Sequence, residues 1–371
     1  MNAMEIPRGA SVPETHPPKS PEMGWRQKAI ANCYFHSPAP RVLRILRDRY
    51  RLTVSRNGKW PRASLEKRTG PSARILYYHR VNDHNDAFFP AITTALFDAQ
   101  MRYVSRHYRV VSLAELVRRL EGQSSQPVVA ITFDDGYRDN YQNALPVLER
   151  YGLPATIFLT TGNLDSREPM WFEQLAAAIQ KSLRDFVDLE IDSGRRYWLR
   201  TSAERLECLD RVFSIFRDLP DAERRIWLPK ILQKLAVPDK GEHMGKMLTW
   251  DQVRFMQKRG IDFGGHTVTH PFLSRMPGEQ VSWEVSECKR RIEEELQQPV
   301  AHFAYPNGRE KDFGVWNKDL IRKAGYRSAV TTIWGPNYRS TDPMELRRGG
   351  PWEKSPAVFA YKLDWYQWVD S

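Results

Sequence analysis

The sequence contains few cysteines and no long apolar run. Its three cysteines, Cys33, Cys208 and Cys288, lie far apart in a chain of 371 residues and form no Cys-x-x-Cys pair. This spacing is typical of free thiols in a reducing compartment rather than of a disulfide framework. The first thirty residues lack the apolar core of a secretory signal. No window reaches the roughly 20 apolar residues of a membrane span. We therefore expect a cytoplasmic protein.

Nucleic-acid-binding motifs are also missing, although the chain is basic. The formal net charge is +11, and the basic residues are scattered along the sequence. A basic surface attracts nucleic acid, anionic membrane or acidic glycan. Without a recognisable motif, a solvated basic face is the favoured interpretation. We expect no nucleic-acid partner, and peripheral contact with a membrane stays an open alternative.

Proline, charge and hydrophobic periodicity divide the chain into segments. Residues 1–40 are rich in proline and polar side chains, which predicts a flexible tail. Residues 41–72 form a basic helical or linker segment whose apolar face docks either on the main domain or on a membrane surface. Residues 73–371 are expected to form the catalytic domain, interrupted by a mainly helical insertion at 172–246. This insertion could be a lid, a dimer contact or a membrane contact.

Within the main domain, short apolar segments alternate with amphipathic ones. The expected strands are residues 73–78, 127–133, 155–160, 260–264, 300–305 and 327–332. Helical patterns lie between them, and Ser112 with Glu115 has the spacing of a helix N-cap. Strands that alternate with helices predict a parallel α/β sheet or barrel.

Two adjacent acids follow the buried strand at 127–133 (PVVAITF). Asp134 and Asp135 stand where this strand ends, and ligands of parallel α/β folds bind at the carboxyl ends of strands. Two carboxylates there need a metal, a cation or hydrogen-bond donors to compensate them. One acid can ligate a metal while its neighbour accepts a proton from water. The alternative is a pair of solvated loop acids.

A pair of histidines follows the strand at 260–264. His266 and His270 are four residues apart, which puts both imidazoles on one face if the segment is helical and suits a divalent ion such as Zn²⁺. Gly264 and Gly265 precede the pair, and we expect them to allow a tight turn. A structural role for both histidines is the competing interpretation.

A third segment, residues 303–308 (FAYPNG), carries no acid or base that titrates near neutral pH. Pro306 and Gly308 predict a rigid turn that aims backbone N–H groups into a pocket, as an oxyanion hole requires. An ordinary turn is the alternative. Residues 76–81 (LYYHRV) place His79 at the end of the first strand.

Taken together and in this order, these segments resemble the polysaccharide deacetylase family, also called the NodB homology domain or carbohydrate esterase family 4. Residues 132–141 resemble its first motif and residues 266–270 its second. Residues 303–308 resemble its third motif in the branch with Tyr-Pro-x-Gly. The resemblance covers about residues 73–350, apart from the insertion.

The resemblance implies a fold, a cofactor and a reaction. The fold is a distorted (β/α)7-type barrel, and the cofactor is a divalent metal, most often zinc. By the family's pattern, Asp135, His266 and His270 bind the metal and Asp134 is the general base. A backbone N–H at Asn307 stabilises the oxyanion. The reaction is hydrolysis of the acetamide of N-acetylated sugars in a polysaccharide or glycan precursor.

The sequence departs from the family pattern at two places. The third motif has Ala304 where many members carry an arginine that holds the catalytic acid. Many members also carry a histidine late in the chain that acts as general acid, and the matching segment here, around Arg347 and Arg348, has none. We expect Arg348, or else Arg347, to replace the missing orienting charge. His79 is a candidate for the acid or for a supporting role.

Two aromatic residues are candidates for substrate binding, Tyr305 in the third motif and Trp334 in the loop after the last strand. Two alternatives to a sugar de-N-acetylase stay open. One is an amidohydrolase or esterase of the same fold that acts on a non-sugar substrate. The other is a catalytically inactive carbohydrate-binding protein. The sequence leaves the oligomeric state open.

Overall fold

A computed structural model describes residues 73–122, 127–166, 168–237, 247–351 and 353–365 of the chain. The expected tail and basic segment, residues 1–72, lie outside the described residues. No helix in the described ranges combines the length and the apolar character needed to cross a membrane.

The main domain is built on a sheet of parallel strands. Its order is β1-β3-β4-β7-β8-β9, and β2 pairs with β3 beside this path. The strands span β1 (Ala73–Tyr78), β2 (Arg109–Val110), β3 (Val128–Phe133), β4 (Ala155–Leu159), β7 (Ile261–Gly265), β8 (His302–Ala304) and β9 (Ser328–Val330). Every residue of β1, β3 and β4 is buried, as expected for apolar strands covered on both faces.

The two edges of this sheet are joined by an irregular segment, residues 346–349. On one side the Leu346 N–H donates to Ala329 O (2.9 Å). On the other side the Gly349 N–H donates to Ile75 O (2.8 Å), and Gly349 O accepts from the Tyr77 N–H (3.1 Å). The segment therefore stands between β9 and β1 and closes the sheet into a distorted barrel. The α/β barrel predicted from the sequence is confirmed.

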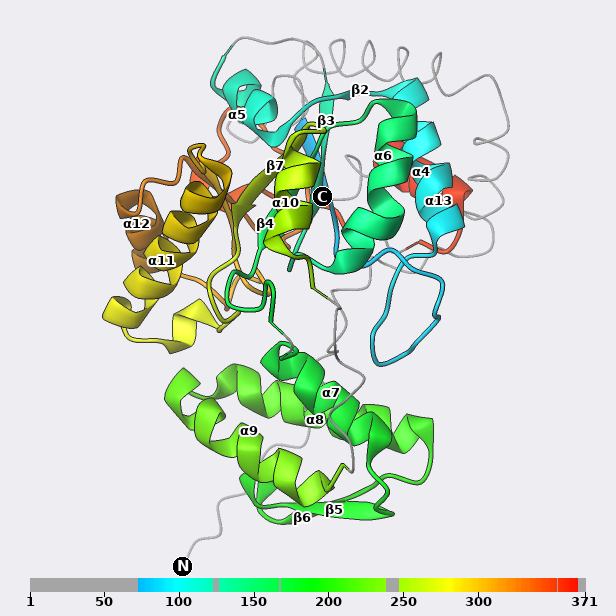
Figure 1. The fold of residues 1–371 in the computed structure, drawn as a ribbon, viewed down its shortest axis with the longest axis vertical. Helices are drawn as coiled ribbons and strands as arrows, with labels where there is room; N and C mark the ends of the chain where they lie inside the picture. The colour runs from blue at the N-terminus through cyan, green and yellow to red at the C-terminus, as the bar shows by residue number, and fades with distance from the viewer. Residues whose placement is uncertain (1–72, 123–126, 167, 238–246, 352, 366–371) are drawn as a thin grey trace, which may run out of the picture.

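Helices surround the barrel in Figure 1. They are α4 (Thr94–His107), α5 (Leu113–Glu121), α6 (Leu145–Tyr151), α10 (Trp250–Gln257), α11 (Gly278–Leu296), α12 (Val315–Lys323) and α13 (Pro356–Trp365). The capping signal at α5 is confirmed, because the Ser112 side chain accepts from the Glu115 N–H (3.2 Å).

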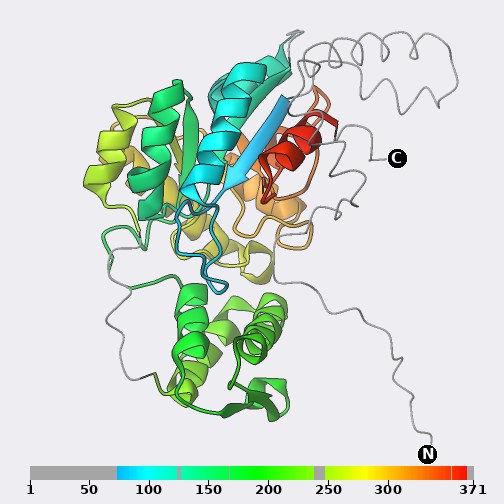
Figure 2. The same cartoon turned by 90° about the vertical axis from the view of Figure 1, so that its right-hand side faces the viewer.

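The insertion forms a separate layer below the barrel in Figures 1 and 2. It consists of α7 (Trp171–Lys181), β5 (Phe186–Leu189), β6 (Arg195–Trp198), α8 (Ser202–Asp218) and α9 (Asp221–Leu235). Strands β5 and β6 form an antiparallel hairpin. The insertion has its own apolar core, which includes Leu175, Leu199 and Phe216. It follows β4 in the chain and therefore covers the end of the barrel where the strands terminate.

Candidate active site

Strand register brings the sequence motifs together at one end of the barrel. Tyr78 pairs with Phe133, and Leu159 pairs with Gly265, which itself pairs with Phe303. The residues that follow these positions therefore emerge side by side. The Asp134 N–H continues the sheet by donating to Tyr78 O (2.9 Å), and the His266 N–H donates to Leu159 O (3.0 Å).

Asp135, His266 and His270 converge in a buried cluster. Asp135 Oδ1 lies 3.4 Å from His266 Nε2 and 3.5 Å from His270 Nε2, and the three candidate ligand atoms all lie within 4.8 Å of one another. Asp135 Oδ1 has no hydrogen-bond partner among the described residues although it is buried. His266 Nδ1 lies 2.8 Å from Ala304 O, so its proton sits on Nδ1 and the Nε2 lone pair faces the cluster. This donor set fits a divalent metal.

The protonation states agree with metal binding. Burial lowers the pKa of His270 to about 3, so its imidazole is neutral at pH 7. Burial alone would raise the pKa of Asp135, but the adjacent histidines hold it well below its usual range. Burial likewise opposes protonation of His266, while the charges of Asp134 and Asp135 raise its pKa. These carboxylates therefore favour a positive charge at His266 Nε2, and a bound metal ion can supply this charge in place of a proton.

The second motif is not helical, so the geometric reason we gave for the histidine pair was wrong. Residues 266–270 form a loop in which Thr267 (φ 68°) and His270 (φ 54°) adopt left-handed conformations. Glu284 on α11 holds this loop. Its carboxylate accepts from the Val268 N–H (2.7 Å), the Thr269 N–H (3.0 Å) and the Thr269 hydroxyl (2.5 Å). The loop backbone, rather than a helix face, turns both imidazoles toward Asp135.

The two glycines before the loop also act differently from the expectation. Gly264 and Gly265 belong to β7, and neither has a positive φ. A Cβ on Gly264 would lie 2.5 Å from the Phe158 ring, and one on Gly265 would lie 2.2 Å from the Tyr326 hydroxyl. They are therefore required for close packing inside the barrel rather than for a tight turn.

Asp134 is paired with Arg348. The guanidinium donates two hydrogen bonds of 2.7 Å, one to each carboxylate oxygen, and Arg348 Nε donates to Thr331 O (2.7 Å). Burial alone would raise the pKa of Asp134, but the charge and hydrogen bonds of Arg348 hold it below its usual value. Asp134 is therefore ionised at neutral pH. Both arginines belong to the segment that closes the barrel, but Arg348 is buried whereas Arg347 is exposed.

A cavity of about 260 Å³ opens onto these residues and contains two further residues predicted from the sequence. His79 Nε2 lies 4.0 Å from Asp134 Oδ2. Asn307 lines the cavity with left-handed backbone (φ 61°). Its side-chain Nδ2 is buried without a hydrogen-bond partner among the described residues. Both are placed for contact with a ligand bound over Asp134 and Asp135.

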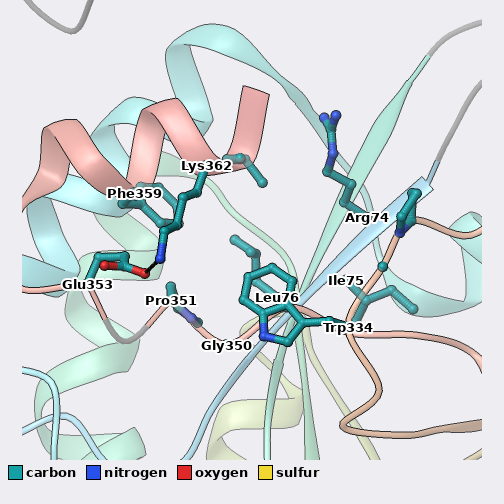
Figure 3. Close-up of a pocket in the computed structure, with 13 residues that line it drawn as sticks. Arg74, Ile75, Leu76, Trp334, Gly350, Pro351, Glu353, Phe359 and Lys362 are labelled. Carbon is teal, nitrogen blue, oxygen red and sulfur yellow. Dashed lines mark hydrogen bonds and ion pairs between the residues drawn. The ribbon is translucent and has the colours of Figure 1, made fainter. Parts of the chain in front are cut away.

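The two aromatic candidates for substrate binding lie away from this cavity. The Tyr305 ring is buried against Phe313, and its hydroxyl donates to Met344 O (2.9 Å). Trp334 lines a different pocket, which Figure 3 shows between β1 and α13. Both side chains follow barrel strands, but neither turns toward the cluster.

The insertion contributes further residues to the cavity. Trp171 Nε1 donates to His270 O (2.9 Å), and the Phe172 ring contacts His270 edge-on at 5.0 Å between centroids. Glu173 and Arg217 also line the cavity, as do apolar side chains of α8 and of residues 87–90. The sequence of an insertion does not indicate which of its faces will pack against the active site.

An α/β barrel with a carboxylate–imidazole cluster beside an ionised acid is an arrangement that can support metal-assisted hydrolysis. The family model "Polysaccharide deacetylase" matches residues 121–194 and 218–329. The chain belongs to the polysaccharide deacetylase family, as its motifs predicted.

Individual relatives agree with this assignment. YxkH of Bacillus subtilis (strain 168) is 24% identical over 280 residues, which cover 74% of this chain and 69% of that protein. The poly-beta-1,6-N-acetyl-D-glucosamine N-deacetylase of Staphylococcus epidermidis is 27% identical over 216 residues, 52% of this chain and 71% of that protein.

Among solved structures, the Streptococcus pyogenes deacetylase PplD in complex with acetate superposes with a TM-score of 0.52 at 21% identity, covering 76% of this chain and 93% of that one. IcaB from Ammonifex degensii gives a TM-score of 0.51 at 19% identity and covers 78% of this chain and 97% of that one. At these identities the structures establish a shared fold.

Proposed function

We propose that this chain is a metal-dependent de-N-acetylase that hydrolyses the acetamide of an N-acetylated sugar in a polysaccharide or glycan precursor. The observation that carries the proposal is the buried cluster of Asp135, His266 and His270 beside the ionised Asp134. Relatives named as N-deacetylases of an N-acetylglucosamine polymer support the choice of bond.

One carboxylate and two imidazoles are a donor set that suits zinc. A zinc ion held by these three residues would act as a Lewis acid toward water and the amide carbonyl. Asp134 then accepts a proton from the attacking water, and Arg348 keeps this carboxylate ionised and fixed in orientation.

The remaining steps belong to two other residues that line the cavity, Asn307 and His79. The Asn307 backbone N–H donates to the acetyl carbonyl oxygen as it becomes an oxyanion, a contact that stabilises the transition state more than the substrate. His79 protonates the leaving nitrogen in this proposal, which is supported by its position in the cavity wall 4.0 Å from Asp134. The products are acetate and a free amino sugar.

The substrate class is tested with a panel of acetylated compounds. We expect zinc-loaded protein to release acetate from N-acetylglucosamine oligomers, and Asp134→Asn to release at least about 10²-fold less. Release only from acetate esters or non-sugar amides would replace this proposal with an esterase or amidohydrolase of the same fold.

The proposed location is the cytoplasm. Cys208 and Cys288 are both buried free thiols, as expected in a reducing compartment. Cell fractionation tests this proposal, and recovery of the protein from a secreted or periplasmic fraction would contradict it.

A further inference from the structure

Two arginines from distant parts of the chain line the active-site cavity together. Arg217 lies on α8 of the insertion, and Arg309 follows Asn307 by two residues. Burial and the nearby charge of Arg217 both lower the pKa of the Arg309 guanidinium. The two positive charges are therefore close enough to repel each other. Like charges brought together at a cavity wall favour an anion between them.

Arg217 has donors to offer such an anion. Its Nε is buried without a hydrogen-bond partner, and its guanidinium takes part in no hydrogen bond or ion pair in the described ranges. Its backbone carbonyl accepts a hydrogen bond from Arg275 Nε (3.2 Å), which leaves the guanidinium donors unused among the described residues. A guanidinium has five N–H donors, and leaving a buried donor unsatisfied is unfavourable. A ligand oxygen would satisfy these donors.

The carboxylates near the two arginines leave an excess of positive charge. Asp312 is buried, and it accepts from the Arg309 N–H through Oδ2 (3.0 Å). Burial raises its pKa even though Arg217, Arg309 and Arg275 act to lower it. Asp218 is paired with Arg275 (3.3 Å). Three guanidiniums therefore share two carboxylates in this region.

The rest of the cavity does not supply a partner for Arg217. Four carboxylates line the cavity. Asp134 is held by Arg348 and Asp135 belongs to the metal cluster. Glu173 acts electrostatically on Arg80, and Asp210, the fourth, forms no ion pair with Arg217 in the described ranges. An anionic ligand is therefore the group that best complements this side of the cavity.

We propose that Arg217 and Arg309 form an anion subsite for a phosphate or carboxylate group carried by the N-acetylated substrate. The inference rests on the proposed function for the sugar itself. Guanidinium groups bind both kinds of oxyanion through paired hydrogen bonds. Because one cavity contains both the metal cluster and the two arginines, a single ligand can reach both. An uncharged N-acetylglucosamine polymer has no group for this subsite, so the preferred substrate carries an acidic group, as in an acidic glycan or a phosphorylated precursor.

The test measures binding by calorimetry and does not depend on turnover. N-acetylglucosamine 1-phosphate, N-acetylmuramic acid and N-acetylglucosamine are titrated into zinc-loaded wild type and Arg217→Met. We expect wild type to bind at least one anionic sugar about tenfold or more tightly than the neutral one, and Arg217→Met to lose most of that preference. The anionic sugar that shows the preference identifies the group as phosphate or carboxylate.

Arg211→Met is the matched control. Arg211 lies on the same helix, pairs with Asp192 and does not line the cavity, so its removal should leave the preference unchanged. Arg217→Gln is the second variant if Arg217→Met fails to fold, and it should lose the preference as well.

Several outcomes would overturn the anion subsite. Equal wild-type affinity for neutral and anionic sugars would do so, as would a preference that persists in the Arg217 variants. A preference that survives in Arg217→Met but disappears on chelation would place the anion on the metal instead. Failure to release acetate from any N-acetylated sugar would count against the proposed function, whereas these binding results would still decide the subsite.

Discussion

Replacing Arg348 with methionine should remove the base without removing the metal ligands. The wild-type guanidinium makes two 2.7 Å hydrogen bonds to Asp134, and both side chains are buried. Breaking a buried ion pair by removing one partner costs about 3–5 kcal/mol of stability. Burial would then be opposed only by the smaller effects of His266 and His79, so the pKa of Asp134 should rise from below its usual value to above it.

The sign of the pH effect follows from this shift. In the wild type the folded-state pKa of Asp134 is depressed, so its contribution to stability is present above its unfolded pKa of about 3.9 and is lost as the pH falls below it. In Arg348→Met the shift reverses, and the variant should become more stable as Asp134 takes up a proton. The acidic limb of kcat/KM against pH should move upward by at least about one unit.

The assay is acetate release from pH 5 to 9, with metal content measured in parallel. We expect kcat at pH 7 to fall by about 10²–10⁴-fold in Arg348→Met, the range attributed to general-base catalysis. Arg348→Lys should be intermediate, because it keeps the charge and loses the paired geometry. Arg347→Met is the control and should resemble wild type, since Arg347 is exposed. Wild-type activity and an unchanged pH profile in Arg348→Met would refute the reasoning.

Two further predictions concern buried polar groups near the site. Glu284→Ala should weaken metal affinity by about 10–100-fold, because the Val268 and Thr269 N–H groups lose their acceptor. Competition with a chelator measures the change. An unchanged affinity would show that the loop keeps its conformation without Glu284. Burial lowers the pKa of His302 to about 4, so its contribution of about 3 kcal/mol should be present above about pH 6.5 and be lost as the pH falls toward 4. His302→Gln should flatten the curve of unfolding free energy against pH in that range, and an equally steep curve would contradict the assignment.

Much of the fold and part of the candidate site could be predicted because strand ends are visible in the sequence. An apolar run followed by polar residues marks the end of a buried strand, and parallel strands end on the same side. This reasoning anticipated that Asp134, Asp135 and His266 would lie together. The resemblance to the family, rather than the strand ends, suggested an arginine near Asp134 and left two candidates, Arg347 and Arg348. The structure places Arg348 there, and its role in catalysis stays a prediction.

What sequence reasoning missed depends on side-chain direction and on packing between distant segments. Tyr305 and Trp334 follow barrel strands, yet one turns into the core and the other into a separate pocket, and the sequence alone does not show which way a loop side chain points. Glu284 and Arg217 matter only through the segments packed against them. Amphipathic periodicity gives a helix its buried face, but it does not identify the partner of a buried charge.

The most direct test of the account is the metal content of the purified protein, measured by mass spectrometry after zinc loading. We predict near-stoichiometric metal in wild type, loss of metal in Asp135→Ala and in His266→Ala, and retention in His302→Gln, which changes a buried histidine outside the cluster. Acetate release should follow the metal in each protein. A wild type that binds no zinc, or full occupancy in both cluster variants, would contradict the account.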